Sequence, residues 1–267
     1  MELGLTGATA VVTGGSKGMG LAIAESLGAE GASVAIMARG RVALDIAAER
    51  VRRAGAPEVL AVRVDMADAE SISAAFASVA DSWNSLNVLV HTIGPSAGAF
   101  DELTDDDWHA AFDLGTLSAV RSVRAALPLL RSADWARIVT LSAHSIQRQS
   151  ARLVAYTAAK SALSSLTKNL SKSLGAEGIL VNCVCPGTIV TASFTEVLRD
   201  VLAADGLDSS DPTDVMTWVE KTYGHPCDIG RAGLPEEIAS ATTYLVSQRN
   251  SYVTGATVNV DGGSDFI

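Results

Sequence analysis

The sequence predicts an α/β fold: a doubly wound parallel sheet of about seven strands with helices on both faces, in a single domain spanning 1–267. Two observations lead to this prediction. Short runs rich in Val, Ile and Leu alternate with longer segments of helical periodicity, which is typical of repeated strand–helix–strand units. Several of the short runs are apolar at consecutive positions, as expected for strands that are covered on both faces.

The expected elements follow in alternating order. Strands are expected at 8–13, 33–38, 59–64, 88–91, 137–142, 179–184 and 257–260. Helices are expected at 19–28, 42–54, 69–82, 105–131, 155–174 and 235–246. Thr104 before three aspartates and Pro235 before two glutamates are typical helix starts. The stretch 192–230 combines acidic turns, prolines and scattered aromatic residues after a strand, which predicts a helical substrate lid inserted into the same domain.

The composition argues against several classes of protein. The net charge of −10 argues against a nucleic-acid partner, because phosphate binding requires a basic face. No apolar run approaches the roughly 18 residues that span a bilayer, and the first residues lack the pattern of a signal peptide. Cys183, Cys185 and Cys227 lack metal-ligand spacing and are expected to be buried thiols. We therefore expect a cytoplasmic protein that acts on a small molecule, without a metal, a membrane or a nucleic acid.

A glycine-rich turn follows the first expected strand. Gly14, Gly18 and Gly20 stand between Thr13 and an apolar helix. Glycines allow a tight turn and let backbone N–H groups approach a pyrophosphate at the helix N-terminus. Such a turn is a weak signal alone, but its position between the first strand and the first helix indicates a dinucleotide site of the Rossmann type.

The end of the second strand predicts which dinucleotide binds. An NAD site usually has a carboxylate there, about 20 residues beyond the glycines, that binds the ribose 2′-hydroxyl. Here the strand ends at Arg39, and the next acid is Asp45. A guanidinium binds a 2′-phosphate through charge-assisted hydrogen bonds, and Lys17 adds a second cation. We expect NADP(H) in preference to NAD(H); the alternative is that Arg39 and Lys17 are merely solvated.

Tyr156 and Lys160 form a candidate acid–base pair. They are four residues apart on an expected helix, so their side chains share one face. The pKa of a free tyrosine is near 10, and a neighbouring ammonium stabilises the phenolate and lowers that pKa. The pattern is common on solvated helices, but with the glycine turn upstream it indicates a proton-transfer group beside a nicotinamide.

Together these segments are similar to those of the short-chain dehydrogenase/reductase family, over essentially the whole chain, and the chain resembles its 3-oxoacyl-ACP reductase-like members. Matching segments are the turn from Thr13 to Gly20, Asp65, Tyr156 with Lys160, Asn182 to Gly187, Arg231 to Gly233 and Gly255 to Gly263. The resemblance implies that Tyr156 is the general acid or base and that Lys160 orients the nicotinamide ribose. It also implies a homodimer or homotetramer, assembled through the helices expected at 105–131 and 155–174.

The turn and the resemblance together give a set of candidate cofactor contacts. In the family, the acid after the third strand contacts adenine, and the segment after Pro-Gly holds the nicotinamide end. The candidates are Gly14, Ser16, Lys17, Gly18, Met19, Gly20, Arg39, Asp65, Met66, Gly94, Tyr156, Lys160, Pro186, Gly187, Ile189 and Thr191.

Two positions after the fourth expected strand depart from the family pattern. The family's Asn-Asn-Ala-Gly begins here with His91 and ends with Gly94. We expect His91 to bridge strands as a structural residue and Gly94 to allow close approach of the cofactor. The asparagine that helps hold a proton-relay water in the family falls at Gly115, for which close packing and cofactor approach are the two explanations.

The substrate-orienting serine of the family, thirteen residues before the tyrosine, falls at Ala143. Ser142 and Ser145 are the candidates to replace it. Ser145 would share the side of Ala143 if the strand continued, because side chains alternate along a strand. Ser142 could serve only if the loop shifts by one residue.

These features predict an NADP-dependent oxidoreductase that reduces a carbonyl, or oxidises a secondary alcohol, with Tyr156 as general acid or base. Apolar residues of the lid suggest a largely apolar substrate; they are Phe194, Val197, Leu198, Met216, Trp218 and Tyr223. One alternative is a reductase of C=C or C=N bonds on the same scaffold, which tolerates loss of the serine and the asparagine. Another is a dinucleotide-binding sensor with weak catalysis.

Overall fold

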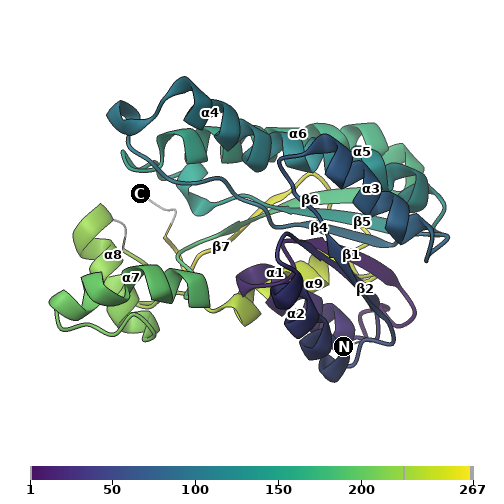
Figure 1. Cartoon of the computed structure of the whole chain (residues 1–267), viewed down its shortest axis with the longest axis horizontal. Helices are drawn as coiled ribbons and strands as arrows, with labels where there is room; N and C mark the ends of the chain where they lie inside the picture. The colour runs from purple at the N-terminus through teal and green to yellow at the C-terminus, as the bar shows by residue number, and fades with distance from the viewer. Residues whose placement is uncertain (1, 225, 265–267) are drawn as a thin grey trace.

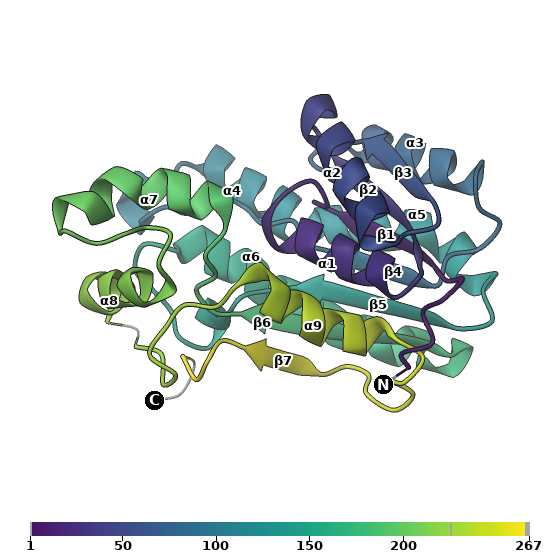
Figure 2. The same cartoon turned by 90° about the horizontal axis from the view of Figure 1, so that it is seen from below.

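The computed structural model describes residues 2–224 and 226–264 and contains one twisted sheet between two layers of helices (Figures 1 and 2). Its strand order is β3-β2-β1-β4-β5-β6-β7, and every neighbouring pair is parallel. The strands are β1 (Thr9–Thr13), β2 (Ser33–Ala38), β3 (Val59–Arg63), β4 (Val88–His91), β5 (Ala136–Leu141), β6 (Ile179–Pro186) and β7 (Thr257–Val260). The predicted doubly wound α/β fold is confirmed, with each expected strand in place.

Helices cover both faces of the sheet (Figures 1 and 2). One layer holds α1 (Gly18–Ala29), α2 (Arg41–Ala54) and α9 (Pro235–Val246), and the other holds α3 (Ala69–Ala80), α5 (Ser118–Arg131) and α6 (Val154–Leu174). Val11 and Val12, neighbours in β1, are both fully buried but belong to different core clusters. Burial on both faces explains why the strands are apolar at consecutive positions. Short 3-10 turns, η1 (Phe100–Glu102), η3 (His144–Ile146) and η4 (Gly175–Glu177), interrupt the connections.

The strand order reverses between β1 and β4, which lie side by side in the middle of the sheet. Their last residues, Thr13 and His91, are register partners. Loops that leave neighbouring strands in opposite directions open a crevice at the carboxyl ends of those strands. The glycine turn after β1 and the Gly94 segment after β4 therefore meet at this point.

The prediction of one continuous helix over 105–131 is wrong. The chain forms α4 (Asp105–Phe112), then a π-helical turn (Asp113–Leu117), and only then α5. A capping box starts α4, since the Asp107 N–H donates to Thr104 Oγ1 and the Thr104 N–H donates to Asp107. The π turn inserts one wide turn where α6 approaches, a geometry that a helical periodicity alone does not reveal.

Close packing explains Gly115, which lies in that π turn. A Cβ atom on Gly115 would stand 2.7 Å from Cβ of Ala159 and 3.2 Å from the ring of Pro95. The asparagine side chain of the family has no room here. Of the two explanations left open by the sequence, contact with α6 and Pro95 is the one the structure shows.

The 192–230 stretch is helical, with α7 (Ala192–Ala204) and α8 (Pro212–Tyr223) set apart from the main layers (Figures 1 and 2). These helices enclose a small core of their own, made of Leu198, Leu202, Val215, Met216, Val219, Cys227 and Ala232. Phe194, Trp218 and Tyr223 pack against that core. Most apolar residues of the lid therefore contact one another, and the lid composition no longer indicates an apolar substrate.

All three cysteines are buried free thiols, as expected. No helix within residues 2–224 and 226–264 is both long enough and apolar enough to cross a bilayer.

The substitution Gly115→Ala should destabilise the fold. Alanine favours a helix by about 1 kcal/mol over glycine, but overpacking a filled contact costs about 1–3 kcal/mol. We expect a melting temperature lower by a few degrees, measured by circular dichroism, and its recovery in the double variant with Ala159→Gly. Gly175→Ala is the control, because a Cβ there would meet no atom within 4 Å. A Gly115→Ala variant as stable as the control would contradict close packing as the reason for this glycine.

Candidate active site

A cavity of about 540 Å³ opens at the carboxyl ends of β1 to β4, beside the start of α1. Among the predicted cofactor residues, those lining it are Gly14, Ser16, Lys17, Gly18, Met19, Gly20, Arg39, Asp65, Met66, Gly94 and Thr191. Sequence reasoning did not name the other lining residues, which are Ala38, Gly40, Ala43, Val64, Thr92, Ile93, Leu114 and Ser193. Most of these are neighbours of predicted residues in the same loops.

The glycines form a backbone cradle at this cavity. Gly14 has φ +73° and Gly18, the first residue of α1, has φ +50°. A Cβ on Gly14 would overlap the Thr92 hydroxyl, and one on Gly20 would overlap the Gly14 carbonyl. Only glycine fits these positions, so bare backbone and a helix N-terminus face the cavity. This arrangement suits a pyrophosphate group.

Cations without ion-pair partners stand at the outer end of the cavity. Arg39 and Lys17 are exposed, and no described carboxylate pairs with either, whereas the nearby Arg41 pairs with Asp45 at 3.1 Å. Arg63, at the end of β3, donates from Nε to the Arg39 carbonyl at 3.2 Å and shares an adjoining hollow of about 400 Å³ with Arg39. Sequence reasoning missed Arg63, although its place at the carboxyl end of the neighbouring strand was a usable signal.

Tyr156 and Lys160 lie on one face of α6, as predicted. Lys160 is buried, and its Nζ stands 6.0 Å from the Tyr156 ring centroid. The ammonium donates to the Ile93 carbonyl at 2.7 Å and to the Leu141 carbonyl at 2.6 Å. A Cβ on Gly94 would lie 3.5 Å from Lys160 Cε and 3.7 Å from Tyr156 Cε2. Gly94 is therefore the point where the cavity and the pair meet.

The electrostatics of the pair differ from the prediction. Burial raises the pKa of Tyr156 to about 12, and the neighbouring Cys185 is a second, smaller cause in the same direction. Burial lowers the pKa of Lys160 to about 8. The predicted lowering of the Tyr156 pKa by Lys160 is not found, because desolvation of the phenolate outweighs an ammonium that is bound to two carbonyls. At neutral pH the phenol is protonated and the ammonium is charged.

The two candidate serines are both buried but differ in their hydrogen bonds. Ser142 Oγ donates to the Lys160 carbonyl at 2.9 Å, so its proton is used inside the fold. Ser145 Oγ, in η3, accepts from Thr157 Oγ1 at 3.2 Å. A hydroxyl can accept and donate at once. Among the described residues, no acceptor is found for the Ser145 proton.

His91 forms the expected structural bridge. Its Nδ1 lies 3.0 Å from Thr13 Oγ1, and its Nε2 lies 3.0 Å from Ser118 Oγ. Since the Ser118 hydroxyl donates to the Leu114 carbonyl, it accepts from Nε2–H, and Nδ1 is the acceptor. Burial, with the charge of Lys160 as a second cause, lowers the pKa of His91 to about 3. The ring is neutral and links β4 to β1 and α5.

Five predicted cofactor residues do not line this cavity: Tyr156 and Lys160, which approach it at Gly94, and three others that lie apart from it. Pro186 ends β6 and is buried. A Cβ on Gly187 would stand 2.8 Å from the Asp261 Cα, so this glycine is required by packing on the chain after β7. Ile189 is buried in the core next to Gly233. Their contact with the nicotinamide end of a cofactor stays a prediction.

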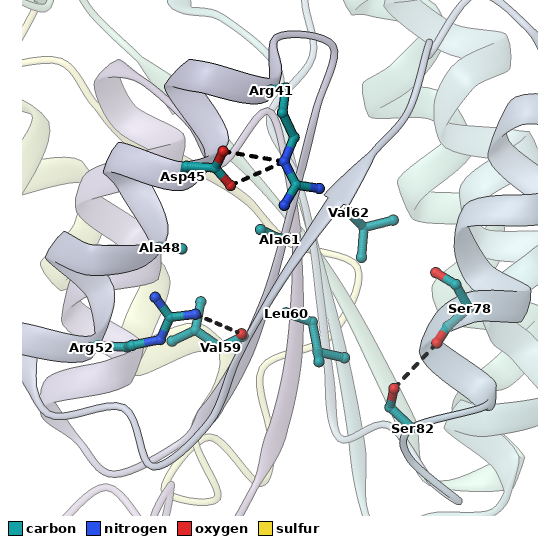
Figure 3. Close-up of a pocket in the computed structure, with 10 residues that line it drawn as sticks. All are labelled: Arg41, Asp45, Ala48, Arg52, Val59, Leu60, Ala61, Val62, Ser78 and Ser82. Atoms are coloured by element: carbon teal, nitrogen blue, oxygen red, sulfur yellow. Dashed lines mark hydrogen bonds and ion pairs between the residues drawn. The ribbon is translucent and has the colours of Figure 1, made fainter.

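A second hollow, of about 420 Å³, lies at the open edge of β3 between α2 and α3 (Figure 3). Its polar groups already have partners within the fold: Arg41 pairs with Asp45, and Arg52 donates to the Val59 carbonyl at 3.4 Å. None of the predicted site residues lines it. The Arg52 bond satisfies one backbone carbonyl of this edge strand. Among the described residues, no cluster of His, Cys, Asp or Glu could hold a metal ion.

Comparisons with known proteins agree with this geometry. A family model described as enoyl-(acyl carrier protein) reductase matches residues 14–265. A curated 3-oxoacyl-[acyl-carrier-protein] reductase from Chlamydia trachomatis is 31% identical over 262 residues, which cover 97% of this chain and 98% of the relative.

Solved structures are similar to this chain over nearly its whole length. L-sorbose reductase from Gluconobacter frateurii, complexed with NADPH and L-sorbose, superposes with a TM-score of 0.93 at 30% identity and covers all of both chains. A singly substituted actinorhodin polyketide ketoreductase with NADPH superposes with a TM-score of 0.86 at 28% identity, covering 98% of each chain. The chain therefore belongs to the short-chain dehydrogenase/reductase family and is an oxidoreductase acting on CH–OH or C=O groups.

Proposed function

We propose that the chain is an NADP(H)-dependent carbonyl reductase, working in reverse as a secondary-alcohol dehydrogenase, with Tyr156 as its general acid or base. One observation carries the proposal: Gly94 joins the glycine-cradled cavity to the Tyr156–Lys160 pair without a side chain between them. When bound there, the nicotinamide supplies the hydride for the carbonyl carbon.

The residues present fit this cofactor. The backbone at Gly14, Gly18 and Gly20 would hold the pyrophosphate, and Asp65 would contact the adenine. Arg39, with Lys17 beside it, would bind the 2′-phosphate. The nicotinamide end would contact Tyr156 and Lys160 together with Pro186, Gly187, Ile189 and Thr191. The solved relatives complexed with NADPH support this choice of dinucleotide.

Proton transfer in this proposal needs only groups of this chain. A phenol whose pKa is raised to about 12 stays protonated at neutral pH, so Tyr156 can donate its proton to the carbonyl oxygen as the alkoxide forms. Lys160, held by two carbonyls, keeps a positive charge near the phenolate that remains. In the oxidation direction the phenolate takes the proton back from the alcohol.

Ser145 is our candidate for the donor that steadies the substrate oxygen. Its hydroxyl accepts from Thr157 and keeps a proton to give, whereas Ser142 donates to the backbone of α6. Ser142 remains the alternative, as it would serve if that bond were exchanged for one to the substrate.

The substrate we propose is a small, largely apolar ketone. The apolar residues of the lid no longer support this choice, because most of them pack against one another. The 3-oxoacyl-[acyl-carrier-protein] reductases among the relatives support a ketone substrate of this kind. L-sorbose, named with a solved relative, is a polar ketone that belongs in the same test.

Two rival functions have specific support. Reduction of a C=C bond, or of a C=N bond, requires less help at the substrate oxygen, which suits Ala143 and the packed Gly115; the matching family model is described as an enoyl reductase. A dinucleotide-binding sensor with weak catalysis would also tolerate both positions. An intact Tyr156–Lys160 pair against the cavity favours catalysis.

We also propose a cytoplasmic homodimer or homotetramer. Apolar side chains are exposed where α4 passes into the π turn and α5, at Phe112 and Leu117. Exposed apolar residues that gather on one helical surface are typical of subunit contacts.

Tyr156→Phe should abolish most turnover while sparing cofactor binding. General acid catalysis contributes about 10²- to 10⁴-fold, so we expect a loss of that size in kcat/KM for NADPH-dependent reduction of a panel of cyclic ketones, 3-oxoacyl thioesters and L-sorbose. Tyr252→Phe is the control, because Tyr252 is 96% exposed. Equal rates for Tyr156→Phe and wild type would exclude the acid–base role. Turnover of enones or imines alone would favour a C=C or C=N reductase. Tight NADPH binding without turnover would favour a dinucleotide-binding sensor.

Ser145→Ala should lower kcat/KM about 100- to 1000-fold, as expected for loss of one donor to a developing oxyanion. Ser142→Ala should lower the melting temperature, because it removes the bond to the Lys160 carbonyl, and leave kcat within about threefold. Steady-state kinetics and thermal unfolding of both variants decide which serine donates to the substrate oxygen. The reverse pattern would assign the role to Ser142.

Arg39→Gln should raise the KM for NADPH about 10-fold or more and change the KM for NADH little, because only NADPH carries the 2′-phosphate. Arg53→Gln is the matched control: it removes one charge from α2, where Arg53 pairs with Glu49. Wild-type enzyme that prefers NADH would contradict the proposed cofactor.

A further inference from the structure

One guanidinium links three segments that lie far apart in the sequence. Arg148 follows η3, in the loop that carries Ser145. Its Nη2 donates to the Gly224 carbonyl at 3.1 Å, and its Nη1 donates to the Ser264 carbonyl at 3.2 Å. Gly224 caps the C-terminus of α8 in the lid, and Ser264 follows β7. Figures 1 and 2 both show the end of the described chain close to α8.

Arg148 suits this role by its chemistry. The last turn of a helix leaves carbonyls without intrahelical partners, and a cation there also meets the negative end of the helix dipole. The planar fork of arginine presents donors in fixed directions, so Nη1 and Nη2 each reach a different carbonyl. Arg148 thus holds the end of α8 and the chain after β7 together.

The loop of Arg148 also contacts the ends of β6 and β7. His144 Nδ1 lies 3.3 Å from the Pro186 carbonyl, and Gln147 Oε1 accepts from Asn259 Nδ2 at 2.9 Å. Ser145 is bonded to Thr157, the neighbour of Tyr156 in α6. A shift of α8 would pull on this loop through Arg148 and move Ser145 relative to the phenol.

We infer that Arg148 is a positioning residue that holds the lid against the Ser145 loop and thereby sets the binding of the carbonyl substrate. The effect on the carbonyl substrate rests on the proposed function. The restraint of the lid by Arg148 rests on the hydrogen bonds described above. Ser193, the lid residue that lines the cofactor cavity, is in the first turn of α7, whereas Arg148 binds the opposite end of the lid. Loss of Arg148 therefore affects the carbonyl substrate more than NADPH.

Limited proteolysis tests the mechanical part without any substrate. Trypsin can cut the lid after Arg199 in α7 and after Lys221 in α8. We expect Arg148→Gln to speed cleavage after Lys221 about 10-fold, followed by mass spectrometry, because cleavage tracks the opening of the segment. Arg152→Gln is the matched control: it removes a trypsin site from the same loop, but its exposed guanidinium makes no bond to the described residues.

Cleavage after Arg53 in α2, outside the lid, should be equal in both variants and reports global unfolding. Equal cleavage after Lys221 in the Arg148→Gln and Arg152→Gln proteins would overturn the inference. So would a faster cleavage at Arg53 and Lys221 alike, which would mean general destabilisation.

Kinetics test the functional part, with the best ketone of the panel. We expect Arg148→Gln to raise the KM for the ketone about fivefold with the KM for NADPH within about twofold, and Arg148→Lys to lie between it and wild type. Equal changes in both KM values, or none, would overturn the positioning role. A wild-type protein without turnover would refute the proposed function alone, since the proteolysis comparison would still decide whether Arg148 holds the lid.

Discussion

The buried ammonium of Lys160 is the interaction on which the rest of the site depends. A cation out of contact with water is costly unless its protons are bound, and here the carbonyls at Ile93 and Leu141 accept them. Leu141 is the last residue of β5, and Ile93 lies two residues beyond the end of β4, so the bonds tie α6 to the carboxyl edge of the sheet. Tyr156, one helical turn earlier, is thereby held beside Gly94 at the mouth of the cofactor cavity.

Around this anchor, the chain replaces polar family positions by packing and by neutral hydrogen bonds. Gly115 lets the π turn contact Ala159, and His91 links β4 to β1 and α5 as an uncharged ring. A charged histidine next to Lys160 would repel it, and burial together with that charge keeps the imidazole neutral. Both positions are therefore accounted for by packing and hydrogen bonds within the fold.

The lid is a separate unit with its own apolar core, joined to the main domain through polar contacts to backbone. Such a unit can shift as a body more easily than a helix packed into the main core. Arg148 is placed where this unit, the chain after β7 and the Ser145 loop come together. In our proposal, substrate selection depends on how the lid is held as well as on which side chains it carries.

Much of this protein could be predicted from sequence because the deciding features are local. Strands buried on both faces are apolar at consecutive positions, so the adjacent valines Val11 and Val12 are enough to indicate a covered sheet. Likewise, a helical spacing of four places Tyr156 and Lys160 on one face, and glycines after a first strand indicate the cradle at Gly14 and Gly20.

Tertiary structure alone decided what depends on neighbours distant in the chain. The reason for Gly115 is a helix some 40 residues later, since Ala159 fills the space of a side chain. The pKa of Tyr156 is set by burial, and burial cannot be predicted from the spacing of Tyr156 and Lys160 along the sequence. The bonds that separate Ser142 from Ser145, and the guanidinium of Arg148 across three segments, likewise arise only when the folded chain brings remote backbone within hydrogen-bonding reach.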